Sequence, residues 1–288
     1  MERRFTSLRL VNVTIAALAA SVLAALAPPP AKAQEAVDVE LVLAVDVSLS
    51  MSYDELKIQR EGYAAALTHD HVLNAIGDGM HGKIAVTYFE WAGEGSQHLI
   101  VPWTVIASRA DAEAVAAKIS ANPPNSARRT SISSGLRYAH DLFAESAFRG
   151  AKRVIDVSGD GPNNQGEWVD VVRDQIVERG IVINGLPLMT RGGSGSAFDI
   201  TDLDRYYEHC VTGGPGSFVV PVNDWQNFPE AVRRKLVMEI AGLTPAPWSY
   251  GALAPADAQP LIRVAETPYD CQVGEKRWRG RSWDWDTP

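Results

Sequence analysis

Short apolar runs rich in valine, isoleucine and leucine recur along the chain and predict a set of β-strands. The run from Val39 to Val45 is interrupted only by Glu40, which is typical of a strand buried on both faces in the middle of a parallel sheet. Five further segments have strand composition and end at turn-forming residues, namely 83–91, 97–106, 153–158, 181–188 and 218–222.

Segments with helical composition separate most of these strands. The first covers 53–67 and follows Ser52, a residue type that caps helix N-termini well. Further helices are predicted at 108–119, 133–147, 168–179, 203–210 and 227–240. This alternation predicts an α/β fold with a doubly wound, mostly parallel central sheet and helices on both faces. Strands 83–91 and 97–106 have no helix between them, so we expect an antiparallel hairpin at the sheet edge.

The first 33 residues have the pattern of a secretory signal peptide. Arg3 and Arg4 open a basic segment, residues 11–27 are apolar and rich in alanine, and Ala31-Lys32-Ala33 fits a signal-peptidase site. We therefore predict cleavage after Ala33 and a periplasmic or secreted protein with no membrane span after cleavage.

The remainder divides into a domain over 34–242 and a tail over 243–288. Proline, alanine and glycine predominate at the start of the tail, and three tryptophans alternate with charged residues at its end, so we expect it to be irregular. The chain has two cysteines, Cys210 and Cys271, and in an exported protein such a pair favours a disulfide over a metal site. This disulfide would tie the tail to the domain.

The charge balance restricts the class of partner. The formal net charge is −8, from 27 basic against 35 acidic residues. Removal of the predicted signal peptide makes it more negative, because that segment carries four basic residues and one acidic residue. Nucleic acids and anionic membranes are bound through basic surfaces, so this balance disfavours both as partners.

The strand that ends near Val45 leads into a polar motif. Asp46, Ser48 and Ser50 form the pattern D-x-S-x-S at the carboxyl end of a central strand, where open α/β sheets place ligand sites. Carboxylate and hydroxyl oxygens suit hard cations such as Mg²⁺, Mn²⁺ or Ca²⁺. The segment therefore indicates a metal site at this edge of the sheet.

DVSLS resembles the first motif of the metal-ion-dependent adhesion site of von Willebrand factor A domains. The resemblance continues with Thr130, which stands before a predicted helix as the second motif does, and with Gly159-Asp160-Gly161, which is similar to the third motif, T-D-G. Two departures are the glycine in place of that threonine and the arginines that precede Thr130. The resemblance covers about 38–242 and is greatest to exported bacterial von Willebrand A-like proteins of a family with no assigned function.

This resemblance implies a divalent cation, Mg²⁺ or else Mn²⁺ or Ca²⁺, held by three hydroxyls and two carboxylates: Asp46, Ser48, Ser50, Thr130 and Asp160. Mg²⁺ takes six oxygen ligands, so one position is left for water or for an Asp or Glu of a partner protein. The expected function is therefore an exported, metal-dependent protein-binding module of the adhesion type. We expect Arg128, Arg129 and the loop after Asp160 to surround the open position.

Two alternatives remain open at this point. The domain could be a structural scaffold whose metal site has no function. It could also be a metal-dependent hydrolase, although none of the six histidines lies in a metal motif and Ser48 occupies the place where an aspartyl-phosphate phosphatase needs a second Asp. We therefore expect no catalytic residues.

Two other features have structural interpretations. Asp156 lies inside an apolar strand, and because an unpaired buried carboxylate is costly, we expect it to have a partner and a structural role. The glycine-rich segment 191–196 lacks the ending of a phosphate-binding loop, so nucleotide binding is not expected.

Overall fold

The computed structural model describes residues 34–190, 200–242 and 268–282. The chain divides into two units, Met1–Gln34 and Glu35–Pro288. The predicted signal peptide, the glycine-rich segment 191–196 and most of the predicted tail lie outside the described residues. No helix in the described part is both long enough and apolar enough to span a membrane.

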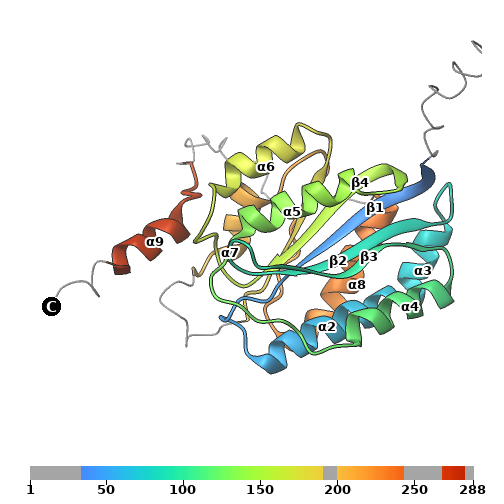
Figure 1. The fold of residues 1–288 in the computed structure, drawn as a ribbon, viewed down its shortest axis with the longest axis horizontal. Coiled ribbons are helices and arrows are strands. Elements are labelled where there is room, and N and C mark those ends of the chain that lie inside the picture. The colour runs from blue at the N-terminus through green and yellow to red at the C-terminus, as the bar shows by residue number, and fades with distance from the viewer. Residues whose placement is uncertain (1–33, 191–199, 243–267, 283–288) are drawn as a thin grey trace, which may run out of the picture. The chain divides into compact units, whose positions relative to one another are not determined.

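A five-stranded sheet forms the centre of the domain, in the order β3-β2-β1-β4-β5 (Figure 1). Strands β2, β1, β4 and β5 are parallel, and β3 pairs antiparallel with β2 at the edge, as predicted. β1 is buried from Glu40 to Asp46, in agreement with its nearly continuous apolar sequence. The strands cover Glu35–Asp46 (β1), Ile84–Trp91 (β2), Gln97–Ile106 (β3), Phe148–Gly159 (β4) and Val182–Pro187 (β5).

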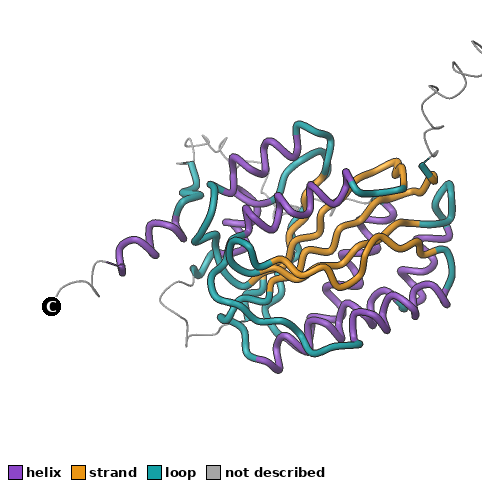
Figure 2. Tube along the Cα trace, in the orientation of Figure 1, coloured by secondary structure: helices purple, strands orange, loops and turns teal. Residues whose placement is uncertain are grey.

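Helices cover both faces of the sheet, and each face has its own apolar core (Figures 1 and 2). One face packs against α2 (Tyr53–Leu67), α3 (Asp70–Gly77), α4 (Arg109–Ser120) and α8 (Phe228–Ala241). The other packs against α5 (Ile132–Ala144), α6 (Val169–Val177), α7 (Leu203–Tyr206) and the π-helix η1 (Tyr207–Val211). A 3-10 turn, η2 (Trp225–Asn227), precedes α8. The predicted doubly wound α/β fold is therefore confirmed.

Local sequence signals set several of these boundaries. Ser52 caps α2 in a reciprocal arrangement, in which its hydroxyl accepts from the Glu55 N–H and the Glu55 carboxylate accepts from the Ser52 N–H. Ser108 caps α4 through the N–H of Asp111. At the end of α8, Gly242 takes a left-handed conformation with φ of 68°, which glycine adopts without strain.

Two predictions of secondary structure need correction, and one helix was missed. Segment 218–222 is not a regular strand but forms isolated parallel bridges with Gly185 and Leu188, because Pro187 between them has no N–H to continue the ladder. The short helix α3 was not predicted. The tail is not irregular throughout, because Val273–Ser282 form helix α9.

Candidate functional site

The carboxyl ends of β1 and β4 carry the two predicted aspartates to the same edge of the sheet. Asp46 is the last residue of β1, and Asp160 directly follows β4, its parallel neighbour. The turn after β1 carries Ser48 and Ser50, and the loop before α5 carries Thr130. The structure therefore brings all five predicted site residues to one end of the sheet.

Four of the five line one pocket of about 410 Å³. Asp46 is completely buried and does not reach its wall. The pocket is lined by Ser48, Leu49, Ser50, Arg128, Arg129, Thr130, Asp160, Gly161, Pro162, Asn164 and Trp278.

Hydroxyl groups connect the two carboxylates. The backbone N–H of Ser48 donates to Asp46 Oδ1 at 2.7 Å, and the hydroxyl oxygens of Ser48 and Ser50 lie 2.7 Å apart. The Ser50 hydroxyl donates to Asp160 Oδ1, also at 2.7 Å. The D-x-S-x-S turn therefore forms a compact group of oxygen atoms with Asp160.

Asp46 is in an unfavourable electrostatic position in the absence of a cation. Burial raises the pKa of its carboxyl well above the ordinary value, and the nearby Asp160 carboxylate raises it further. Its Oδ2 atom is buried and has no hydrogen-bond partner. A bound cation would offset both effects, because it neutralises a buried carboxylate and gives its free oxygen a ligand. The residues present thus fit a divalent cation.

The donor set is rich in neutral oxygens. Within the described ranges, no cluster of three or more His, Cys, Asp or Glu side chains has an arrangement that would hold a metal. A cation at this position would therefore depend on hydroxyl ligands beside only two carboxylates. The two carboxylates formally balance the charge of a divalent cation, and the hydroxyl ligands add no further negative charge.

Backbone hydrogen bonds fix the loop that carries Thr130. The N–H of Thr130 donates to Asn164 Oδ1 at 3.0 Å, and the N–H of Asn164 donates to the Thr130 carbonyl at 2.8 Å. Ala127 exchanges hydrogen bonds with the backbone beside Ser48, where Leu49 N–H donates to its carbonyl at 2.8 Å. Backbone groups therefore hold the Thr130 loop to its neighbours, and the Ser50–Asp160 hydrogen bond links the first motif to the third.

Two supporting residues were missed in the sequence. The Gln59 side chain, buried on α2, donates from Nε2 to the Asp46 carbonyl at 2.8 Å. The buried Glu90 carboxylate accepts from Arg60 Nε and from Asn125, which anchors the loop before Thr130. A polar residue on the buried face of a helix is the signal that marks Gln59, whereas Glu90 and Arg60 meet only in the folded chain.

The two arginines before Thr130 differ in their surroundings. Arg128 is exposed, whereas the guanidinium of Arg129 stacks on the ring of Trp278, with Cζ 3.4 Å from the ring centroid. Arg129 has φ of 77°, an uncommon conformation for a residue with a side chain. Both arginines line the pocket, as expected, and Trp278 brings the C-terminal helix to the same place.

Asp156 has a structural partner, as predicted. Lys235 of α8 places Nζ 2.7 Å from Asp156 Oδ1, and both side chains are fully buried. Lys235 also pairs with Glu239, whose carboxylate accepts from Asn184 at 3.0 Å. This cluster joins α8 to β4 and β5.

A larger pocket of about 580 Å³ lies near the opposite ends of the strands. Its lining includes Asp38 of β1, Lys152 of β4 and His71 of α3. No residue of the predicted site lines it, so its size alone does not make it the functional site.

A family model described as Protein of unknown function (DUF1194) matches residues 36–244. No curated protein matches the sequence. Among solved structures, the pilus adhesin SpaC from Lactobacillus rhamnosus GG superimposes with a TM-score of 0.55 at 14% identity, over 74% of this chain and 32% of that protein. The alignment therefore spans about a third of the length of SpaC.

Two other solved structures are similar at comparable identity. Proximal thread matrix protein 1 from the mussel byssus gives a TM-score of 0.50 at 13% identity, over 72% of this chain and 49% of its own. A von Willebrand factor type A protein from Catenulispora acidiphila gives 0.46 at 15% identity, over 71% and 43%. At such identities the similarity concerns the fold.

Proposed function

Since the chain belongs to the family described as Protein of unknown function (DUF1194) and has a von Willebrand factor A-like fold, we propose its function from the chemistry of its own site. The protein is an exported protein-binding module, in the periplasm or outside the cell. It binds its partner through a divalent cation at the carboxyl edge of the sheet.

Asp46, Ser48, Ser50, Thr130 and Asp160 would hold the cation, with Mg²⁺ the first candidate and Mn²⁺ or Ca²⁺ the others. When bound, the cation supplies a positive charge to which a carboxylate of the partner coordinates. The chain itself orients the hydroxyls, keeps Asp46 out of water and leaves one side of the site open to the pocket.

One observation carries this proposal: the buried Asp46 Oδ2, which has no hydrogen-bond partner and lies close to a second carboxylate. An empty scaffold would gain stability from a neutral residue here, because an uncompensated buried carboxylate is costly. Two acids and three hydroxyls at one position are therefore better explained by a cation than by structure alone.

A binding role is favoured over a hydrolytic one by the groups around the pocket. Its lining within the described residues offers hydroxyl, carboxylate, guanidinium and indole groups, but no imidazole that would act as a general base. This protein has a net negative charge, but the exposed Arg128 and the stacked Arg129 place positive charge at the pocket. These two side chains also favour an acidic partner.

The test is capture of exported proteins on the immobilised mature protein in Mg²⁺, with elution by EDTA. Ser48→Ala should abolish capture of whatever EDTA releases, and Ala substitution of one exposed Asp or Glu on the identified partner should do the same. Arg128→Ala together with Arg129→Ala should weaken capture while Mg²⁺ binding persists. Capture that survives both EDTA and Ser48→Ala at full strength would support the scaffold alternative.

A further inference from the structure

We infer that helix α9 is a wall of the partner-binding pocket, and that it selects acidic peptides with an aromatic or aliphatic residue beside the metal-directed Asp or Glu. The inference rests on the proposed function, and it adds the specificity of the same site. Val273 at the start of α9 packs against the core on one face of the sheet, and the helix continues from there to the site.

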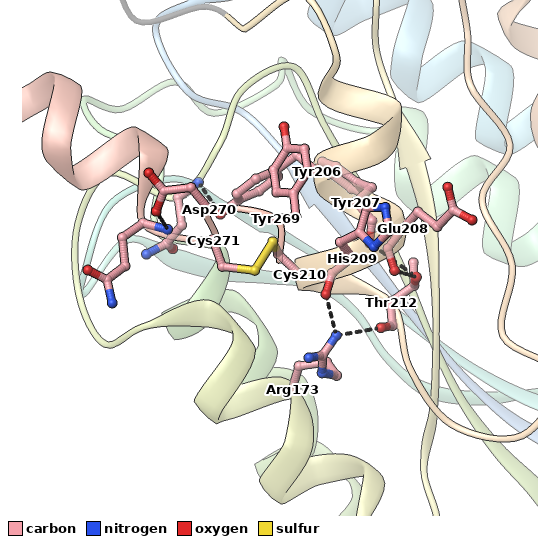
Figure 3. The surroundings of a disulfide bond; sticks show 12 residues. Arg173, Tyr206, Tyr207, Glu208, His209, Cys210, Thr212, Tyr269, Asp270 and Cys271 are labelled. Carbon is pink, nitrogen blue, oxygen red and sulfur yellow. Dashed lines mark hydrogen bonds between the residues drawn. A yellow bond between two sulfur atoms is a disulfide. The ribbon is translucent and has the colours of Figure 1, made fainter. Parts of the chain in front are cut away.

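The disulfide attaches the segment before α9 to the domain (Figure 3). Cys271 bonds to Cys210, which is fully buried in η1, across a sequence separation of 61 residues. Beside it, the Tyr269 hydroxyl lies 2.9 Å from Asp202 Oδ2, and its ring stacks on His209 with centroids 5.4 Å apart. This attachment fixes the direction in which the chain approaches the site.

The first turn of α9 then contacts the loop that follows Asp160. The side chain of Asn163 in that loop donates to Glu275 Oε1 at 2.8 Å and accepts from the Ser133 N–H at 3.0 Å. Gly274 lies so close that a β-carbon there would be 2.0 Å from the Asn163 carbonyl oxygen. The helix is therefore fitted to the site loop and is not merely tethered near it.

One turn further on, Trp278 completes the pocket. Its ring stacks on Arg129, the residue before Thr130, and it lines the same pocket as Asp160. The contact holds the Arg129 guanidinium in one place and puts an indole in the wall of the pocket beside the candidate metal site.

The remaining walls have a mixed chemistry that fits a peptide. Leu49 is 57% exposed although it directly follows a site serine, and the buried Pro162 also lines the pocket near Asp160. The exposed Arg128 adds a positive charge to the pocket lining. A peptide with a carboxylate and a neighbouring apolar side chain would match the hydroxyl-lined metal site, the two arginines and the apolar part of the pocket wall together.

The size of the pocket supports the same occupant. A volume of about 410 Å³ is within the range of sites for whole ligands and exceeds what a single carboxylate group or a few waters fill, since a water takes roughly 30 Å³ in the liquid. A carboxylate directed at the metal site therefore leaves room for a neighbouring side chain in the pocket, which Leu49 and Trp278 also line.

A displayed library of random heptapeptides, selected on the mature protein in Mg²⁺ and again in EDTA, tests the inference. Wild type should enrich Asp or Glu next to aromatic or aliphatic residues, in Mg²⁺ only. Trp278→Ala should keep the acidic preference, lose the neighbouring apolar preference, and bind the selected peptides about tenfold more weakly, as expected from loss of one aromatic contact. Trp168→Ala is the matched control, because Trp168, the N-cap residue of α6, is 53% exposed and does not line the pocket.

A Cys210→Ser/Cys271→Ser variant should shift the selection in the same direction as Trp278→Ala, because its α9 is no longer tied to η1. Mg²⁺ titration by calorimetry, run on each variant, separates this inference from the proposed function. Suppose that wild type binds Mg²⁺ and enriches acidic peptides, but Trp278→Ala enriches the same neighbouring apolar residues and binds the selected peptides with equal affinity. That result refutes the role of α9, while the proposed function stands. If wild type binds no Mg²⁺, or enriches no acidic peptide, the inference fails with its premise.

Discussion

The hydroxyl oxygen of Tyr207 lies 2.7 Å from the position that a β-carbon on Gly159 would take, and Asp46 Oδ2 lies 2.9 Å from the same point. Tyr207 is fully buried in η1, and its hydroxyl has no hydrogen-bond partner. This geometry explains why a glycine stands where related domains have a threonine: the tyrosine hydroxyl occupies the space of the side chain. It also places a hydroxyl beside Asp46 that no motif in the sequence indicates.

Gly159→Ala should therefore destabilise the protein by about 1–3 kcal/mol, the usual cost of overpacking a buried site. Gly161→Ala is the matched control, because a β-carbon there has no atom within 4 Å. Tyr207→Phe removes the contacting oxygen and should recover part of the loss in a double-mutant cycle. Urea denaturation measures wild type, the three single variants and the Gly159→Ala/Tyr207→Phe double variant, and equal effects of the two alanine substitutions would contradict the explanation.

Glu239 should make stability dependent on pH. Burial raises the pKa of its carboxyl to about 7, and Asp156 adds to the effect while Lys235 opposes it. The folded state then holds this proton more tightly than the unfolded chain, so the contribution is fully present below about pH 4.5 and is lost as the pH rises to about 7.

Glu239→Gln should accordingly flatten the pH dependence of the free energy of unfolding between these two values. Glu230→Gln on the same helix is the control, because that side chain is 59% exposed and should leave the dependence unchanged. Denaturation curves at several pH values give the comparison, and a wild-type profile retained in Glu239→Gln would assign the dependence to other groups.

The disulfide should contribute strongly to stability. A crosslink across 61 residues stabilises by about 4 kcal/mol in the chain-entropy model, which is an upper value. The Cys210→Ser/Cys271→Ser variant should thus unfold at a clearly lower denaturant concentration than wild type. Intact-mass analysis after thiol labelling should find no free thiol in the exported protein, and two labelled cysteines would exclude the bond there.

The fold could be predicted because its signals are local. The apolar run of β1, the Ser52 cap and the missing helix between β2 and β3 each determine a feature within a few residues. The signals of the candidate site are local too, because its five oxygen ligands stand just after strands or before a helix, but their role in metal binding stays a prediction. The prediction of a disulfide between the only two cysteines was also confirmed.

The features that were missed depend on contacts between distant residues. Helix α9 is polar and has no apolar periodicity, and its described attachments include the disulfide, Asn163 and Arg129. In the sequence Tyr207 cannot be told from an ordinary core residue, and only the packing of η1 against β5 brings its hydroxyl beside Asp46. Such residues carry no signal in a single sequence.

The central claim is tested most directly by the melting temperature of the mature protein as Mg²⁺ is added. A cation that binds only the folded state stabilises it by mass action, by about 2.7 kcal/mol at a hundred times the dissociation constant. Wild type and the exposed control Asp141→Ala should both show this rise, whereas Asp46→Ala and Thr130→Ala should melt at a temperature independent of Mg²⁺. A rise of equal size in all four proteins would contradict the assignment of the metal site.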